Sequence, residues 1–191
     1  MIKAASLLLS CYLAVFNTIP GNEDAKLIDK VETYYNEVMS NTRLTQKVKV
    51  YDDPDRGVKE GQLKGYYKKG KLVLLVNNYA DGANCHQTVS YIIQNEMLVL
   101  IDAYRQCTFT VGKKELAEYR QDKSYFNEQK LSLCITREGE GEDNAEKIQF
   151  KGQPFTIDDE KRLLDNVAFW RRFLDSELTY KQFARIRPYK F

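Results

Sequence analysis

The sequence predicts an α+β fold, an antiparallel meander of three or more β-hairpins packed with an N-terminal and a C-terminal helix. Two observations support this fold class. One pattern occurs three times in the middle of the 191-residue chain, as GYYKKGKLVLLV (65–76), SYIIQNEMLVLI (90–101) and SYFNEQKLSLCI (124–135). A stretch with apolar residues at helical spacing lies on each side of these copies, at 23–40 and 157–175.

Each copy has the composition of a β-hairpin. Its aromatic and branched apolar residues suit a pleated, half-buried surface. Gly70 and Asn95 are residue types that accept a positive φ at low cost, as a tight hairpin turn requires. Gln129 is a poorer turn residue, so a longer or less regular third loop is expected.

The turn positions also predict a register. The first hairpin pairs Tyr67 with Leu72 on one face of the sheet and Tyr66 with Val73 on the other. The copies begin at unequal intervals along the chain (65, 90 and 124), which favours consecutive hairpins of one sheet over a regular solenoid.

The segments before the copies predict a helix and a strand. The helix at 23–40 carries an apolar stripe and is expected to cover the same face of the sheet as the C-terminal helix, or an end of the sheet. The stripe comprises Leu27, Val31, Tyr34, Tyr35 and Val38. Residues 46–51 alternate in polarity and predict a strand, and 52–57 is a loop by composition.

Shorter elements are expected between and after the copies. Residues 107–111 predict a short strand, and the charged segment 113–121 predicts a helical turn or a loop. Residues 138–144 (EGEGEDN) predict an acidic loop, and 146–151 a returning strand.

The C-terminal helix begins at Thr156, which has capping-box spacing with Asp159. Its apolar stripe is expected to pack on the sheet, with Trp170 against the strands of the first two hairpins. This stripe comprises Leu163, Val167, Trp170 and Leu174. The basic, aromatic tail at 178–191 is expected to form an edge strand or a flexible end.

The N-terminus indicates export. Residues 1–21 are interpreted as a signal segment and linker, and 22–191 as a single α+β domain. Leu8-Leu9-Ser10-Cys11 resembles a bacterial lipobox, which makes Cys11 the expected lipidation site and a membrane attachment point. A secretory peptide cleaved near 19–21 and an uncleaved apolar start that packs as a strand or helix are the alternatives. The apolar run at 4–16 is too short to span a bilayer.

The other cysteines fit an oxidising compartment. Cys85 precedes the second hairpin and Cys107 follows it, one residue out of register, so a bulge or slip would allow a disulfide between them. Cys134 is then a buried thiol or an alternative partner of Cys107. In the cytoplasm, all four cysteines would be reduced and inert.

No pattern of catalytic, cofactor-binding or metal-binding residues is predicted. Cys85 and His86 are neighbours in a strand and point to opposite faces, which does not suit a nucleophile and its base. The acidic segments 52–55 and 138–143 lack the spacing of a calcium loop. The net charge of +2 and the scattered Lys and Arg residues do not indicate nucleic-acid binding.

Two features of the sequence resemble a known group of proteins: the short lipobox and the motif Tyr66-Tyr67-Lys68-Lys69-Gly70-Lys71-Leu72. Over 61–137 it resembles uncharacterised secreted proteins and lipoproteins of Bacteroidetes-like bacteria. The resemblance implies an exported, hairpin-rich protein and implies no active residues.

These observations predict an exported, lipid-anchored, non-enzymatic binding or structural protein of the cell envelope, in the periplasm or anchored to the outer membrane. Its expected partner is a protein or an envelope glycan. The alternatives are an envelope hydrolase that uses scattered carboxylates, and a secreted inhibitor or immunity protein. A pocket with converging carboxylates would favour the hydrolase, whereas a flat aromatic face or a protruding loop would favour a binding protein.

Overall fold

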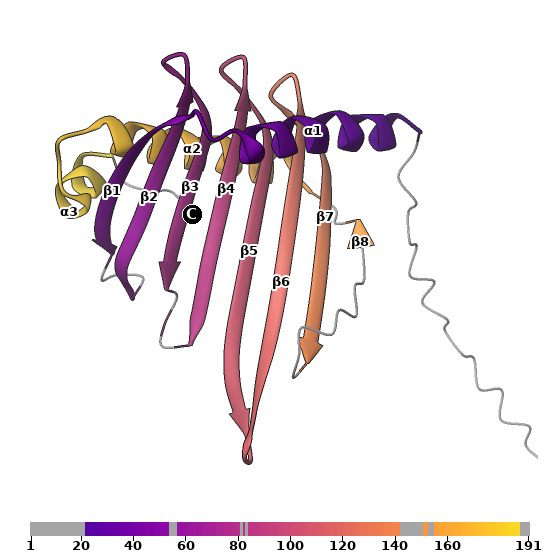
Figure 1. The fold of residues 1–191 in the computed structure, drawn as a ribbon, viewed down its shortest axis with the longest axis vertical. Coiled ribbons are helices and arrows are strands. Elements are labelled where there is room, and N and C mark those ends of the chain that lie inside the picture. Colours follow the sequence, from indigo (N-terminus) through magenta and orange to yellow (C-terminus); the bar gives the residue numbers. More distant parts are fainter. Residues whose placement is uncertain are drawn as a thin grey trace, which may run out of the picture.

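A computed structural model describes residues 22–53, 57–80, 82, 84–141, 151–152 and 155–187. Its centre is an eight-stranded antiparallel sheet whose strands follow one another in sequence order (Figure 1). The strands are β1 (Thr45–Asp53), β2 (Val58–Lys68), β3 (Lys71–Ala80), β4 (Cys85–Gln94), β5 (Met97–Val111), β6 (Lys114–Asn127), β7 (Lys130–Gly141) and β8 (Lys151–Gly152). The predicted meander is therefore confirmed.

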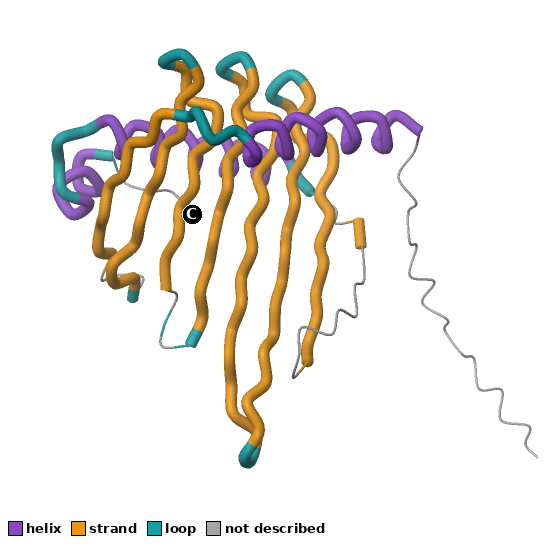
Figure 2. Tube along the Cα trace, in the orientation of Figure 1, coloured by secondary structure: helices purple, strands orange, loops and turns teal. Residues whose placement is uncertain are grey.

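Helices cover both faces of this sheet. Helix α1 (Asn22–Ser40) crosses the front face in Figures 1 and 2, and α2 (Ile157–Asp175) lies behind the sheet with α3 (Tyr180–Ile186). The N-terminal and C-terminal helices of the predicted α+β fold are thus present. The expectation that the N-terminal helix shares a face with the C-terminal helix, or covers an end, is wrong: α1 and α2 lie on opposite faces. The strands carry apolar side chains on both sides, and each side needs a cover.

The three repeated segments form three nearly identical hairpins. Each turn has two residues with positive φ: Lys69 and Gly70 at 52° and 77°, Asn95 and Glu96 at 51° and 68°, and Glu128 and Gln129 at 49° and 66°. The expectation of a longer third loop is wrong. A two-residue turn of this type follows the strand twist, and here Glu128 and Gln129 adopt it without glycine or asparagine.

Each hairpin also has a bulge beside its turn. The pairing shifts between Tyr66 and Tyr67, between Ile92 and Ile93, and between Tyr125 and Phe126. Tyr67 pairs with Leu72 as predicted, but Tyr66 pairs with Leu74 and not with Val73. A bulge adds one residue to one strand, and a register derived from the turn alone does not include it.

Four of the expected elements differ from the structure. Residues 107–111 and 113–121 belong to the long β5 and β6, whose hairpin extends beyond its neighbours at the bottom of Figure 1. Strand β7 continues into the expected acidic loop as far as Gly141. The tail forms α3, which begins with a capping box between Thr179 and Gln182.

Two buried cores result. The core behind the sheet joins α2 and α3 to side chains such as Leu63, Leu75 and Tyr91. The core in front joins α1 to Leu74, Ile92 and other residues of the opposite strand face. Trp170 belongs to the rear core and is 2% exposed.

Some predictions fall on residues that the structure does not describe. These are the lipidation of Cys11, the signal segment and linker at 1–21, most of the strand at 146–151, and the last four residues of the tail. In the described ranges, no helix is long and apolar enough to cross a membrane.

Candidate functional site

A cavity of about 210 Å³ lies behind the sheet, between α2 and strands β3, β4 and β5. We call it the tyrosine–amide cavity. The strands contribute Asn77, Tyr79, Gln87, Val89, Tyr91, Ile101 and Ala103, and α2 contributes Arg162, Leu163, Asn166 and Trp170. On each strand these residues are two positions apart and share a face, and on α2 they follow helical spacing.

Three amide side chains in this wall are held by tyrosine hydroxyls. Tyr51 Oη donates to Asn77 Oδ1 at 2.7 Å. Tyr79 Oη donates to Gln87 Oε1 at 2.7 Å. The third bond joins the sheet to α2, where Tyr91 Oη donates to Asn166 Oδ1 at 3.2 Å.

These bonds occupy the oxygen atom of each amide. A primary amide has an acceptor oxygen and an NH₂ group with two donor hydrogens. Because each oxygen accepts a tyrosine hydroxyl, the NH₂ group of each amide is the end left to donate. The tyrosine hydroxyls thus fix the oxygen end of each amide within the cavity wall.

The indole of Trp170 is fixed by packing against other aromatic rings. It lies 5.1 Å from the Tyr51 ring and 5.9 Å from the Tyr180 ring, measured between ring centroids. Tyr180 is in turn anchored to β1, because its hydroxyl donates to Asp53 Oδ2 at 2.7 Å. Residues of β1, α2 and α3 therefore hold the aromatic part of the cavity wall.

The cavity reaches solvent at Arg162, whose side chain is 57% exposed. Its Nη2 lies 3.1 Å from Asp159 Oδ1. Asp159 also completes the capping box with Thr156, and the hydrogen bonds from Thr156 lower the pKa of this carboxyl. Among the described residues that line the cavity there is no carboxylate, imidazole or thiol.

A charged cluster lies on the opposite face, between α1 and the sheet. Glu32 of α1 accepts hydrogen bonds from Tyr125 Oη at 2.6 Å and from Lys123 Nζ at 2.7 Å. Lys123 Nζ also lies 3.8 Å from Asp102 Oδ2, and Asp102 Oδ1 accepts from Gln121 Nε2 at 2.7 Å. We call these five residues the Glu32 cluster.

Burial shifts the pKa values of this cluster. Loss of hydration raises the pKa of Asp102, against the opposing effects of Gln121 and Lys123. Loss of hydration and the bond to Glu32 raise the pKa of Tyr125 far above its usual range, so that its hydroxyl stays a donor. Each carboxylate is already occupied by sheet side chains, so this cluster attaches α1 to the sheet.

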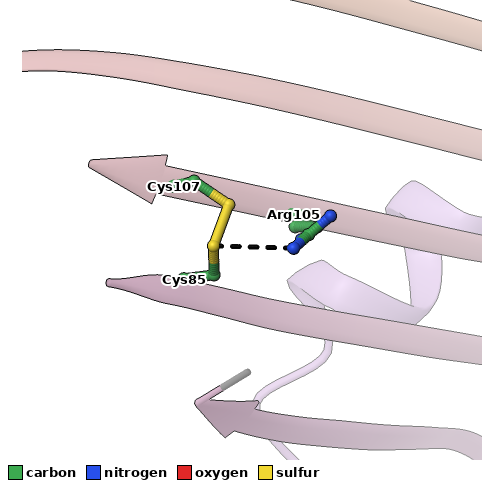
Figure 3. Close-up of a disulfide and its surroundings, with 3 residues drawn as sticks. All are labelled: Cys85, Arg105 and Cys107. Carbon is green, nitrogen blue, oxygen red and sulfur yellow. Dashed lines mark hydrogen bonds between the residues drawn. A yellow bond between two sulfur atoms is a disulfide. The ribbon is translucent and has the colours of Figure 1, made fainter. Parts of the chain in front are cut away.

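The cysteines singled out in the sequence lie at the lower end of the β4–β5 hairpin. Cys85 faces Cys107 directly, with Cα atoms 4.0 Å apart, and the two form a disulfide (Figure 3). The bulge between Ile92 and Ile93 supplies the one-residue shift that brings them into register. Arg105 Nη2 lies 3.6 Å from Cys85 Sγ, as Figure 3 also shows.

The disulfide lies next to the cavity wall. Cys85 is two residues from Gln87 on β4 and so points to the same face of the sheet. His86 points to the other face, and with Cys85 in a disulfide the two residues do not form a catalytic pair. Cys134 is a free thiol near Ser124 Oγ at 3.6 Å, and burial raises its pKa.

The acidic segment at 52–55 has structural roles where it is described. Asp52 Oδ1 accepts from the backbone of Glu60 at 2.9 Å, and Asp53 binds Tyr180. In the described part of the chain, no three His, Cys, Asp or Glu residues come together to hold a metal ion.

The residues of the tyrosine–amide cavity were not expected from the sequence. The available signal was weak: Asn77 ends the apolar run of β3, and Asn166 lies between Leu163 and Trp170 on the buried stripe of α2. A polar residue in such a position needs a partner inside the fold. Tyr51 and Asn166 come from elements far from their partners in the sequence, so the sequence does not show that these residues meet. Tyr79 and Gln87 are cross-strand neighbours on β3 and β4.

Comparison with protein-family profiles, curated protein sequences and solved structures found no match to this chain.

Proposed function

We propose that this chain is an exported, lipid-anchored, non-enzymatic binding protein of the cell envelope, and that the tyrosine–amide cavity is its ligand site. The observation that carries the proposal is the set of three amides held by Tyr51, Tyr79 and Tyr91. Binding sites combine apolar walls with a few fixed polar groups, and this cavity has that composition.

The same composition favours binding over hydrolysis. A hydrolase that uses carboxylates needs an acid and a base within reach of one substrate. The carboxylates of the Glu32 cluster, Glu32 and Asp102, lie across the sheet from the cavity and are held by Lys123. Apart from Arg162, the described lining of the cavity consists of amide, tyrosine and apolar side chains, which suit binding better than proton transfer.

The size of the cavity limits the ligand. A volume of about 210 Å³ is below the roughly 300–1,000 Å³ that drug-sized ligands occupy. At ~30 Å³ per water molecule, it corresponds to about seven waters. We therefore expect a small uncharged polar molecule, or the end of a larger one that enters past Arg162.

The proposal is tested by melting the protein with a panel of small uncharged compounds: sugars, open-chain polyols and neutral amides. A bound ligand raises the free energy of unfolding by about 2.7 kcal/mol at 100 times its Kd. We expect a concentration-dependent rise in melting temperature, absent in Asn166→Ala, with the compound recovered intact by mass spectrometry. Recovery of a cleaved compound would support the hydrolase, and the absence of any rise would contradict binding in this cavity.

A further inference from the structure

We infer that this protein has a second binding site, which takes an aliphatic carboxylate such as a medium-chain fatty acid. The site is a groove of about 340 Å³ on the rear face of the sheet. It lies between the part of α2 at 164–172 and the turns of the β4–β5 and β6–β7 hairpins, and we call it the α2–turn groove. None of its described lining residues lines the tyrosine–amide cavity, so the inference goes beyond the proposed function.

The floor of the α2–turn groove is apolar. Ile93 and Leu98 face each other across β4 and β5 and are 3% and 6% exposed. On the helix side, Leu164, Val167 and Ala168 share one face of α2 and are partly exposed. The side chain of Ala168 is a single methyl group, so it leaves space between the helix and the hairpin. An apolar chain in this space would cover these side chains and remove apolar surface from water.

One end of the groove carries two cations, Arg171 and Arg172, both of them exposed. Arg172 Nε donates to the backbone oxygen of Ala168 at 3.1 Å, which holds this guanidinium beside the groove. Within the described ranges, neither arginine forms an ion pair, and the carboxylate of Asp175 on the same helix is bound by Lys47 at 3.3 Å. A guanidinium presents two parallel N–H groups that match the two oxygens of a carboxylate.

The groove also has a carboxylate, Glu96, at the turn of the β4–β5 hairpin. Glu96 Oε1 lies 3.2 Å from Lys71 Nζ, and both side chains are exposed. Because Lys71 offsets the charge of Glu96, Arg171 and Arg172 leave the groove with an excess of positive charge. This excess favours an anionic head group over a neutral or a cationic one.

The dimensions of the groove fit a medium-length chain. Its volume lies near the lower limit of the roughly 300–1,000 Å³ of small-molecule sites. At ~30 Å³ per water molecule, it has room for roughly eleven water-sized groups, which is close to the number of heavy atoms in octanoate. Leu164 and Arg171 are separated by about 10 Å along the helix axis, close to the length of extended octanoate. A carboxylate bound at Arg171 would therefore place the end of its chain near Leu164.

Calorimetric titration of the full chain with octanoate tests the inference, because octanoate stays monomeric at millimolar concentrations. We expect one octanoate per chain, with a Kd of about one millimolar or lower. Hexanoate should bind about tenfold more weakly, since each buried CH₂ group changes the affinity roughly fourfold. Octanol has the same chain without the charge and should bind about fivefold more weakly than octanoate.

Variants connect the binding to the groove. The double variant Arg171→Gln/Arg172→Gln should weaken octanoate binding about fivefold and change octanol binding less than about twofold. Ala168→Leu fills the space above the floor and should weaken both ligands at least about tenfold. Lys161→Gln is the matched control, because it removes an exposed charge of α2 outside the groove lining and should change the Kd less than about twofold. Melting temperatures show that each variant is folded.

Several results would overturn the inference. These are the absence of octanoate binding, equal affinity for octanol and octanoate, and wild-type affinity for octanoate in both the arginine double variant and Ala168→Leu. A short peptide that ends in a leucine carboxylate and binds more tightly than octanoate would also overturn it, because the occupant would then be a protein C-terminus. The proposed function is tested separately, since its panel contains only uncharged compounds and its variant, Asn166→Ala, changes the other cavity.

Discussion

At the scale of single residues, the polar groups between α1 and the sheet are buried or partly buried, and each has a hydrogen-bond or ion-pair partner. In the Glu32 cluster, Glu32 accepts hydrogen bonds from Tyr125 and Lys123, and Asp102 accepts one from Gln121. Asp102 is the least favourable member, because its side chain is 9% exposed and its ammonium partner is 3.8 Å away. Loss of hydration therefore dominates and raises its pKa.

This shift predicts a pH effect. A carboxyl whose folded pKa is above its ordinary value of about 3.9 gives its full stabilisation below that value. The stabilisation is lost as the pH rises through the raised folded pKa. Asp102→Asn mimics the protonated form and keeps the oxygen that accepts from Gln121, so we expect it to stabilise the protein at neutral pH and to flatten the pH dependence of stability.

Urea unfolding between about pH 4 and pH 8 measures this effect. Asp175→Asn is the control, because Asp175 pairs with Lys47 on the surface, where its side chain is 59% exposed. That change should stay within about 0.5 kcal/mol at every pH. A lower free energy of unfolding for Asp102→Asn at neutral pH would show that attraction to Lys123 outweighs the loss of hydration.

At the scale of elements, α2 closes the cavity and completes the rear core. It contacts the sheet closely at Gly65, where an added Cβ would collide with Leu174 Cδ2. Its buried residues are Phe169, Trp170, Phe173 and Leu174. The capping box at Thr156 fixes where the helix begins and therefore which of its residues face the cavity.

Removal of the Trp170 side chain should be costly. Trp170→Ala leaves a void in the rear core and should lower the free energy of unfolding by about 3–5 kcal/mol. Ile157→Ala is the control on the same helix, because Ile157 is 85% exposed and should be nearly neutral. Denaturant titrations compare the two variants, and equal midpoints for Trp170→Ala and the wild type would show that α2 is not part of the core.

The disulfide between Cys85 and Cys107 is a second stabilising feature at this scale. It closes a loop of 22 residues at the lower end of the β4–β5 hairpin. Reduction should lower the free energy of unfolding by about 3 kcal/mol, through the loss of a constraint on the unfolded chain. The double variant Cys85→Ser/Cys107→Ser should reproduce the effect of reduction, whereas Cys134→Ser should not. An unchanged midpoint after reduction would contradict this account.

The elements also show how far the sequence determines the fold. Local signals predicted both long helices and all three hairpins, because turn residues and apolar spacing act over a few residues. The bulges, the length of β5 and β6, and α3 depend on long-range contacts. Tyr180, for example, is buried through its bond to Asp53, which is far away in the sequence. The cavity was missed largely for the same reason, since the bonds of Asn77 and Asn166 join elements that are not neighbours in the sequence.

At the scale of the whole molecule, the two sides of the sheet have different roles, because different helices cover them. The front side attaches α1 through the Glu32 cluster, and the rear side holds the cavity beneath α2. The chain reaches α1 directly from residues 1–21, so a lipid on Cys11 would tether the protein at the end of α1.

Lipidation is tested by growth with radiolabelled palmitate in a bacterium that processes lipoproteins. The wild type and the control Cys134→Ala should be labelled, and Cys11→Ala should not. The mature protein should begin at Cys11. Equal labelling of all three proteins, or an intact Met1, would contradict the anchor without affecting the cavity.

The central claim, that the tyrosine–amide cavity is a ligand site, is tested most directly by NMR of the side-chain NH₂ groups. In a ¹H–¹⁵N spectrum, addition of a compound that raises the melting temperature should shift the side-chain amide signals of Asn77, Gln87 and Asn166. The amide signals of Gln106 and Gln121, on the opposite face, should stay in place. Shifts that spare the three cavity amides, or that occur on the opposite face instead, would contradict the claim.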